Sequence, residues 1–118
     1  MIEDIQTLGH TLGSHTFSHA SLKVLSTCEL QKEIVQSREE IEKATGKICK
    51  YFAFPFGTQN YFDKKSVDLV NRIYDYSFTS GLYKNFFFEE DEQILSRRHF
   101  ECNWPIDHIK YFISKQRR

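Results

Sequence analysis

Three of the five histidines of the chain lie in one stretch, residues 9–19, which reads GHTLGSHTFSH. His15 and His19 stand four positions apart, and two imidazoles can hold a divalent metal such as zinc where the chain turns between them. Helical HExxH zinc sites use the same spacing, but they place a glutamate base between the histidines, which residues 16–18 do not supply. The spacing alone leaves two interpretations open: a metal site in a loop, or ordinary surface and hydrogen-bonded histidines.

The segments that would position these histidines are predicted to be short strands. Residues 9–14 predict a strand that runs into a loop, and the apolar residues 51–54 predict a buried strand. Further strands are predicted at 76–79 and 94–99, and the aromatic-rich residues 83–88 are expected to be a strand or a covered loop.

Three helices are predicted between and after these strands. The first runs from a capping box at Ser26 and Glu29 to a stop at Gly46. Its apolar stripe is Leu30, Ile34, Ile41 and Ala44, and its solvated face is Lys32, Glu33, Glu39, Glu40 and Lys43. Asn60 is expected to cap the second helix, in which Phe62, Leu69, Val70 and Ile73 share a face. Pro105 fits the first turn of a closing helix, whose expected inward residues are Ile106, Ile109, Phe112 and Ile113.

Strands that alternate with helices indicate βα units, so the predicted fold class is α/β with a parallel sheet or barrel. In such folds the functional residues gather at the C-terminal ends of the strands, where residues 13–15 (GSH) and 55–57 (PFG) both fall. A length of 118 residues without a linker or repeat predicts one domain, residues 1–118.

The composition excludes several classes of partner. Sixteen basic residues balance sixteen acidic ones, so no overall field favours nucleic acid, and the basic residues 114–118 are interpreted as a solvated helix end. No apolar run is long enough to span a bilayer, and the first residues do not form a signal peptide. Cys28, Cys49 and Cys102 lack CxxC spacing and are expected to be reduced thiols.

Residues 9–22 closely resemble the second motif of the polysaccharide deacetylases, the NodB-homology family of carbohydrate esterases, which typically reads GHEIGNHTxSHxxL. The match covers the glycines, the first histidine, the His-Thr pair, the Ser-His pair and the final leucine. In that family the two histidines of the HTxSH core bind the metal, which implies this role for His15 and His19. His10 stands at the frequent histidine before the core and is interpreted as structural.

A second segment, residues 52–57 (FAFPFG), resembles the third family motif, in the branch that reads F-A-Y-P-x-G. The motif arginine that orients the catalytic aspartate is replaced here by Ala53. The resemblance implies that the backbone N–H of Phe56 is the oxyanion donor. Residues 95–97 (LSR) are loosely similar to the Leu-Pro-Arg of the last strand, which makes Arg97 a further catalytic candidate. His99 is the histidine nearest to the family's late Leu-x-His motif, although its offset from Leu95 differs.

The first family motif, Thr-Phe-Asp-Asp-Gly, is absent from this sequence. Its aspartates supply the general base and complete the metal site. We therefore expect a partial, distorted (β/α) barrel, a truncated domain that corresponds to the C-terminal part of the family fold. Whether such a chain is an active enzyme stays open, and an exposed strand edge is expected to favour self-association.

The resemblance implies a metal-dependent hydrolase, most simply a zinc enzyme, that removes N-acetyl groups from a glycan. The metal would polarise the amide carbonyl and activate water. The aromatic residues Phe17, Phe54 and Trp104 either face sugar rings or belong to the core, and the sequence favours the core at least equally. An inactive remnant that binds a glycan or a partner, and a hydrolase of small amides, are the alternatives. The family acts mostly on cell-envelope or secreted glycans, although the sequence itself identifies no compartment.

Overall fold

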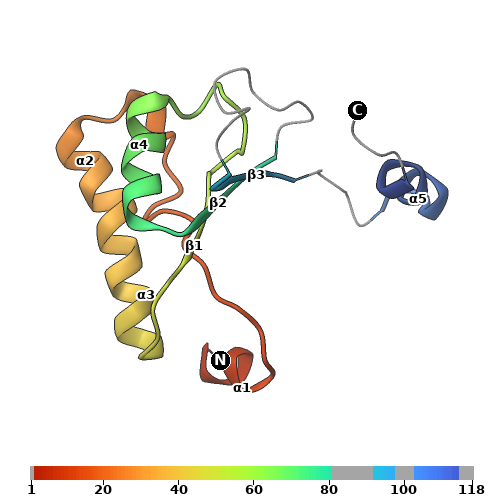
Figure 1. Cartoon of the computed structure of the whole chain (residues 1–118), viewed down its shortest axis with the longest axis horizontal. Helices are drawn as coiled ribbons and strands as arrows, with labels where there is room; N and C mark the ends of the chain where they lie inside the picture. The colour runs from red at the N-terminus through yellow and green to blue at the C-terminus, as the bar shows by residue number, and fades with distance from the viewer. Residues whose placement is uncertain (1, 81–91, 98–102, 115–118) are drawn as a thin grey trace.

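A computed structural model of the chain describes residues 2–80, 92–97 and 103–114 (Figure 1). Its centre is a parallel sheet in the order β1 (Tyr51–Ala53), β2 (Tyr76–Thr79) and β3 (Ile94–Ser96). Tyr51 pairs with Tyr76, and Ser77 pairs with Ile94. This arrangement confirms the predicted α/β class with a parallel sheet.

The N-terminal segment contributes less strand than the sequence predicts. Within residues 9–14 only Ser14 pairs with the sheet, through an isolated parallel bridge to Phe52 on the free edge of β1. A short helix that the sequence analysis did not predict, α1 (Ile2–Thr7), precedes it and buries none of its residues. A single 3₁₀ turn, η1 (Leu22–Val24), follows the histidine loop.

The predicted first helix is present, but its middle is not regular. It consists of α2 (Thr27–Gln31), a π-helical turn η2 (Lys32–Gln36) and α3 (Ser37–Thr45). The Ser26–Glu29 capping box and the left-handed Gly46 at the C-terminus are both as predicted. The stripe is shorter than predicted, because Ala44 is exposed and Ile41 is only half-buried.

The second helix, α4 (Lys64–Ile73), begins later than predicted, and the prediction that Asn60 caps it is wrong. Its cap is Asp63, whose carboxylate accepts the Ser66 N–H at 2.9 Å while the Ser66 hydroxyl oxygen accepts the Asp63 N–H. Both residues of this box form hydrogen bonds that satisfy otherwise unpaired N–H groups.

The closing helix, α5 (Ile106–Ser114), follows Pro105 as predicted. The prediction that Ile106 faces inward is wrong, since its side chain is 66% exposed. The side chains of Phe112 and Ile113, the predicted segment 83–88 and the end of the predicted last strand at 98–99 lie outside the described residues.

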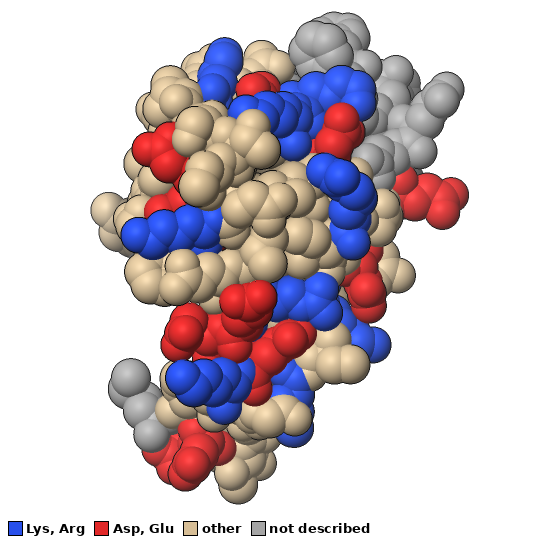
Figure 2. Space-filling model, turned by 90° about the vertical axis from the view of Figure 1, so that its left-hand side faces the viewer, with Lys and Arg blue, Asp and Glu red and all other residues tan. Residues whose placement is uncertain are grey.

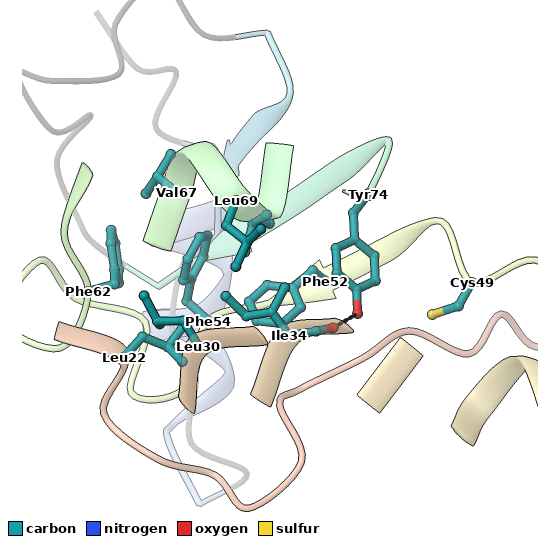
Figure 3. Packing of buried hydrophobic residues seen from close by; sticks show 11 residues of the cluster. Leu22, Leu30, Ile34, Cys49, Phe52, Phe54, Phe62, Val67, Leu69 and Tyr74 are labelled. Atoms are coloured by element: carbon teal, nitrogen blue, oxygen red, sulfur yellow. Dashed lines mark hydrogen bonds between the residues drawn. The ribbon is translucent and has the colours of Figure 1, made fainter. Parts of the chain in front are cut away.

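The core lies between the sheet and the helices α2, α3 and α4, which cover one of its faces in Figure 1. Figure 3 shows Phe52 and Phe54 of the β1 region packed among Leu30, Ile34 and Tyr74. Burying each such side chain stabilises the fold by about 1.5–3 kcal/mol. The complete set of buried apolar residues is Leu22, Leu30, Ile34, Cys49, Phe52, Phe54, Phe62, Val67, Leu69, Val70 and Tyr74.

Basic and acidic side chains are interspersed on the face of the molecule that carries these helices (Figure 2). Over the described residues, the helices are too short or too polar for any of them to span a bilayer.

Candidate metal site

Ser14 fixes the start of the histidine loop against the sheet and the helix. Its N–H donates to the Tyr51 carbonyl and its carbonyl accepts the Ala53 N–H, both at 2.8 Å. Its buried hydroxyl lies 2.7 Å from the Ser37 hydroxyl of α3. Gly13 allows this close approach, because a Cβ there would lie 2.9 Å from the Tyr51 carbonyl oxygen. The backbone just before His15 is therefore held on both sides.

The ring of His15 is oriented by a backbone carbonyl. Its Nδ1 lies 2.8 Å from the Ala53 carbonyl oxygen. A carbonyl can only accept, so Nδ1 carries the proton and the Nε2 lone pair is left for a ligand. This is the usual arrangement of a metal-binding histidine, whose second nitrogen donates to a carbonyl or carboxylate.

His19 is brought beside His15 by a backbone with two left-handed residues. Thr16 has φ = 68° and His19 has φ = 61°, and a β-branched residue in this region is rare. The His19 N–H donates to the Thr16 hydroxyl at 3.0 Å, which closes the turn. The two imidazole rings then meet edge to face, with centroids 4.8 Å apart. Strained backbone of this kind is concentrated at functional sites in proteins.

Glu33 of the π-helical turn reaches into this loop, so the prediction that it lies on a solvated face is wrong. Its side chain is buried, and its carboxylate accepts the Phe17 and Ser18 N–H groups at 2.9 and 2.8 Å. The Ser18 hydroxyl donates to the other oxygen at 2.6 Å. Burial opposes ionisation, but the hydrogen bonds from Ser18 and Phe17 outweigh it and hold the pKa of Glu33 below its ordinary value.

The turn after β1 lies next to the histidines. Phe56 and Gly57 are both left-handed, with φ = 60° and 66°. The Phe56 ring contacts the His19 ring at a centroid distance of 4.8 Å and stacks on Tyr61 at 4.4 Å. Ser80 ties the turn to the end of β2, because its N–H donates to the Gly57 carbonyl at 2.9 Å. No described residue accepts a hydrogen bond from the Phe56 N–H.

Residues 1–73 match the family of polysaccharide deacetylases. The chain belongs to the polysaccharide deacetylase family. The uncharacterized protein YlxY of Bacillus subtilis is 31% identical over 62 residues, which are 52% of this chain and 18% of that protein. A peptidoglycan-N-acetylglucosamine deacetylase of Bacillus cereus is 28% identical over 57 residues, 48% of this chain and 21% of that protein.

Solved structures of the family share the fold. A polysaccharide deacetylase from Bacillus cereus superimposes with a TM-score of 0.77 at 23% identity, over 96% of this chain and 35% of that one. A pseudoenzyme of carbohydrate esterase family 4 from Bacillus anthracis superimposes with a TM-score of 0.55 at 25% identity, over 60% of this chain and 24% of that one. The chain therefore has the fold of part of a polysaccharide deacetylase (β/α) barrel, and it spans about a third or less of each of these four relatives.

An open cavity of about 400 Å³ adjoins His15 in this deacetylase fold. Ala53 and Phe78 line it on the sheet side. The Arg97 guanidinium lies 5.3 Å from the centre of the Phe78 ring, and the Arg97 N–H donates to the Thr79 carbonyl at the end of β2. Arg97 thus contacts Phe78 without lining the cavity itself, and the other late candidate, His99, lies outside the described residues.

The aromatic candidates for contact with sugar separate into different environments. Phe17 is 49% exposed beside the histidines, with the Lys32 ammonium 5.6 Å from its ring centre. Phe54 is only 1% exposed, so of its two interpretations the core one is confirmed and it does not face a sugar. Trp104 is half-buried just before α5, and His10 is exposed on a separate hollow beside Ile41.

The donors present match part of a zinc site. Two imidazoles with adjacent rings, one of them with its Nδ1 proton held by a carbonyl, are suitable ligands for zinc. Within residues 2–80, 92–97 and 103–114, no group of three His, Cys, Asp or Glu side chains is placed to hold a metal. The described chain thus offers two nitrogen ligands, and a third ligand is not among its described side chains.

Sequence analysis found the two histidines but missed Glu33 and Ser80, which fix the two loops of the site. A signal for Glu33 was available, since it stands three residues after Leu30 and therefore on the buried side of the helix. No pattern marked Ser80, because its role depends on the contact between two strand ends.

Proposed function

We propose that this chain supplies the metal-binding histidines and the oxyanion donor of a metal-dependent hydrolase that removes N-acetyl groups from a polysaccharide. The observation that carries the proposal is the histidine pair: His15 has its Nδ1 bound to Ala53, and the ring of His19 lies beside it. The two left-handed residues of the loop, Thr16 and His19, support the proposal, because strained backbone is concentrated at functional sites.

The residues divide the work of amide hydrolysis. His15 and His19 would hold a divalent metal, most simply zinc, which when bound supplies Lewis-acid activation of the acetyl carbonyl and of water. The Phe56 N–H would donate to the carbonyl oxygen as it gains negative charge, with the turn held in place by Ser80. Water adds to the carbonyl carbon, the C–N bond breaks, and acetate and the free amine leave. The proposal assigns no residue of this chain as the general base that takes the proton from water.

A glycan is favoured over a small amide as the substrate, because one matched relative is a peptidoglycan-N-acetylglucosamine deacetylase. The exposed ring of Phe17 beside the histidines is suitable for stacking on a sugar. Such a substrate would place the protein at the cell envelope or outside the cell.

A second candidate function is binding without turnover. The observation that favours it is that two histidines are the whole ligand set among the described side chains, and one matched structure is a family pseudoenzyme. Under this alternative the same loop and cavity would bind an acetylated glycan and release no acetate.

Zinc binding by the purified chain tests the proposal. We expect one zinc ion per chain, with binding lost in His15→Ala and in His19→Ala and kept in the control His108→Ala, whose side chain is exposed on α5. Equal affinity in all four proteins would refute the histidine assignment. Acetate release from acetylated chito-oligosaccharides then separates the two functions, since zinc and glycan binding without acetate supports the second.

Self-association is a further expectation for the isolated chain. The sheet ends at the Ser14 bridge on one side and at β3 on the other, and no other described strand pairs with either edge. Open edges pair with other chains, most simply with a second copy. Light scattering after size exclusion should show a dimer at high concentration, and a monomer at every concentration would contradict this expectation.

A further inference from the structure

The carboxylate of Glu33 is the only buried acidic side chain among the described residues. A buried carboxylate usually pairs with a cation, but none of the ion pairs within the described chain includes Glu33. All of its hydrogen bonds go instead to Phe17 and Ser18 of the histidine loop. The feature to be explained is a buried charge whose partners are two consecutive backbone N–H groups and one hydroxyl.

Phe17 and Ser18 are the two residues between the left-handed residues Thr16 and His19. Their amides point at the same carboxylate oxygen, so the peptide planes in the middle of the loop are fixed by the helix. The ends of the loop are fixed separately, by Ala53 at the His15 ring and by the Thr16 hydroxyl at the His19 N–H. With the Glu33 contacts in place, the N–H groups of Phe17, Ser18 and His19 are each held by a hydrogen bond.

The helical turn that carries Glu33 is itself held in place by the core. Glu33 stands in the π-helical turn Lys32–Gln36, and such turns are frequently found at functional sites. The neighbouring Ile34 is completely buried, and its carbonyl accepts hydrogen bonds from the Ser37 and Tyr74 hydroxyls. The helix turn that presents the carboxylate is therefore held by the core.

We propose that Glu33 is the positioning residue of the histidine pair: its carboxylate holds the loop in the shape that keeps the two imidazole rings beside each other. The inference rests on the function proposed above, in which those imidazoles bind a metal. The hydrogen bonds of Glu33 go to Phe17 and Ser18, and Glu33 is not a metal ligand in this proposal. Outer residues that orient metal-binding histidines typically change metal affinity by about 10–100-fold when they are replaced.

The test compares Glu33→Gln with Glu42→Gln in the purified chain. Glu42 is the matched control. It stands in the same helical segment as Glu33 but away from the loop, and its carboxylate also accepts a backbone N–H, that of Cys49, at 2.9 Å. We expect Glu33→Gln to weaken zinc binding by at least about tenfold and Glu42→Gln to leave it within about twofold. Unchanged zinc affinity in a folded Glu33→Gln variant would overturn the proposal.

A second measurement needs no metal. Amide exchange by NMR should accelerate at Phe17 and Ser18 in Glu33→Gln, with no change in Glu42→Gln. If the wild-type chain binds no zinc, the proposed function fails, and these metal-free signals decide the role of Glu33. Equal amide exchange at Phe17 and Ser18 in the two variants would then overturn the positioning role of Glu33.

If Glu33→Gln does not fold, Ser18→Ala replaces it, since this change removes only the hydroxyl that donates to the carboxylate. We expect a several-fold loss of zinc affinity with an unchanged circular dichroism spectrum. Wild-type affinity in Ser18→Ala would count against the positioning role.

Discussion

Gly57→Ala is the substitution for which the structure predicts the largest local effect near the site. Gly57 has φ = 66°, a conformation that L side chains rarely adopt. A Cβ at this position would lie 2.0 Å from the Ser80 hydroxyl oxygen and 2.7 Å from the Ser80 nitrogen. Because the second atom is backbone, the end of β2 or the Phe56–Gly57 turn has to move.

The magnitude follows from two contributions. The left-handed conformation costs an L residue about 1–2 kcal/mol. The displacement of Ser80 breaks its N–H bond to the Gly57 carbonyl and its hydroxyl bond to the Phe56 carbonyl, each worth about 0.5–1.5 kcal/mol. We therefore expect Gly57→Ala to lower the free energy of unfolding by about 2–5 kcal/mol.

Gly46→Ala is the matched control. Gly46 has nearly the same angle, φ = 67°, but a Cβ there meets nothing within 4 Å. It should lose only the conformational part, about 1–2 kcal/mol. Urea unfolding followed by circular dichroism measures both variants. If the two losses are equal, the close contact between Gly57 and Ser80 does not exist, and the argument that Ser80 fixes the Phe56 turn fails.

Three further outcomes are expected. Tyr74→Phe should destabilise the chain by about 1 kcal/mol in urea unfolding, because the buried hydroxyl donates to the Ile34 carbonyl at 2.7 Å; unchanged stability would argue against that bond. Iodoacetamide should label the exposed Cys28 in the folded chain and leave Cys49 unmodified, because Cys49 is buried and burial raises the pKa of its thiol. Peptide mass spectrometry measures the labelling, and equal labelling of both cysteines would contradict this expectation. The pKa of Glu33 is lowered on folding, so the stability it contributes is present above the ordinary glutamate pKa of about 4.3 and is lost as the pH falls through the lower folded value. The difference in unfolding free energy between wild type and Glu33→Gln should therefore shrink between about pH 5 and pH 3, and a constant difference would refute it.

The parts of the fold that the sequence predicted are those with local causes. The Ser26–Glu29 box and Gly46 bound the first helix because capping depends on residues within one turn of the helix end. The strand at 51–53 followed from a short apolar run that ends in a turn, and the strand at 76–79 was also predicted. The second cap was misplaced for a related reason: Asn60 and Asp63 both have capping side chains, and only the reciprocal partner Ser66 distinguishes them.

The sequence was enough to predict the candidate metal ligands of the site, but not the residues that orient them. His15 and His19 carry their chemistry in their own side chains, so a motif of residue types was enough to find them. The contacts that orient them come from residues far away in the sequence: Ala53 lies 38 positions from His15, and Glu33 lies 15 positions from Ser18. Such pairs are brought together only when the helix packs on β1, which composition and local spacing do not encode.

Glu33 shows how a polar residue in an apolar position can be misread. The spacing from Leu30 placed it on the buried side of the helix, but its charge suggested solvent. A buried carboxylate is tolerated only where donors satisfy it, and in this chain those donors are the N–H groups that a left-handed loop cannot pair within itself. The strained loop and the buried charge therefore stabilise each other, because the loop N–H groups donate to the carboxylate. Each would be unfavourable alone, and together they hold the two histidines in one orientation. A glutamate at the core-facing position of the helix after an HTxSH sequence is thus a pattern to look for when the support of such a loop has to be found from sequence.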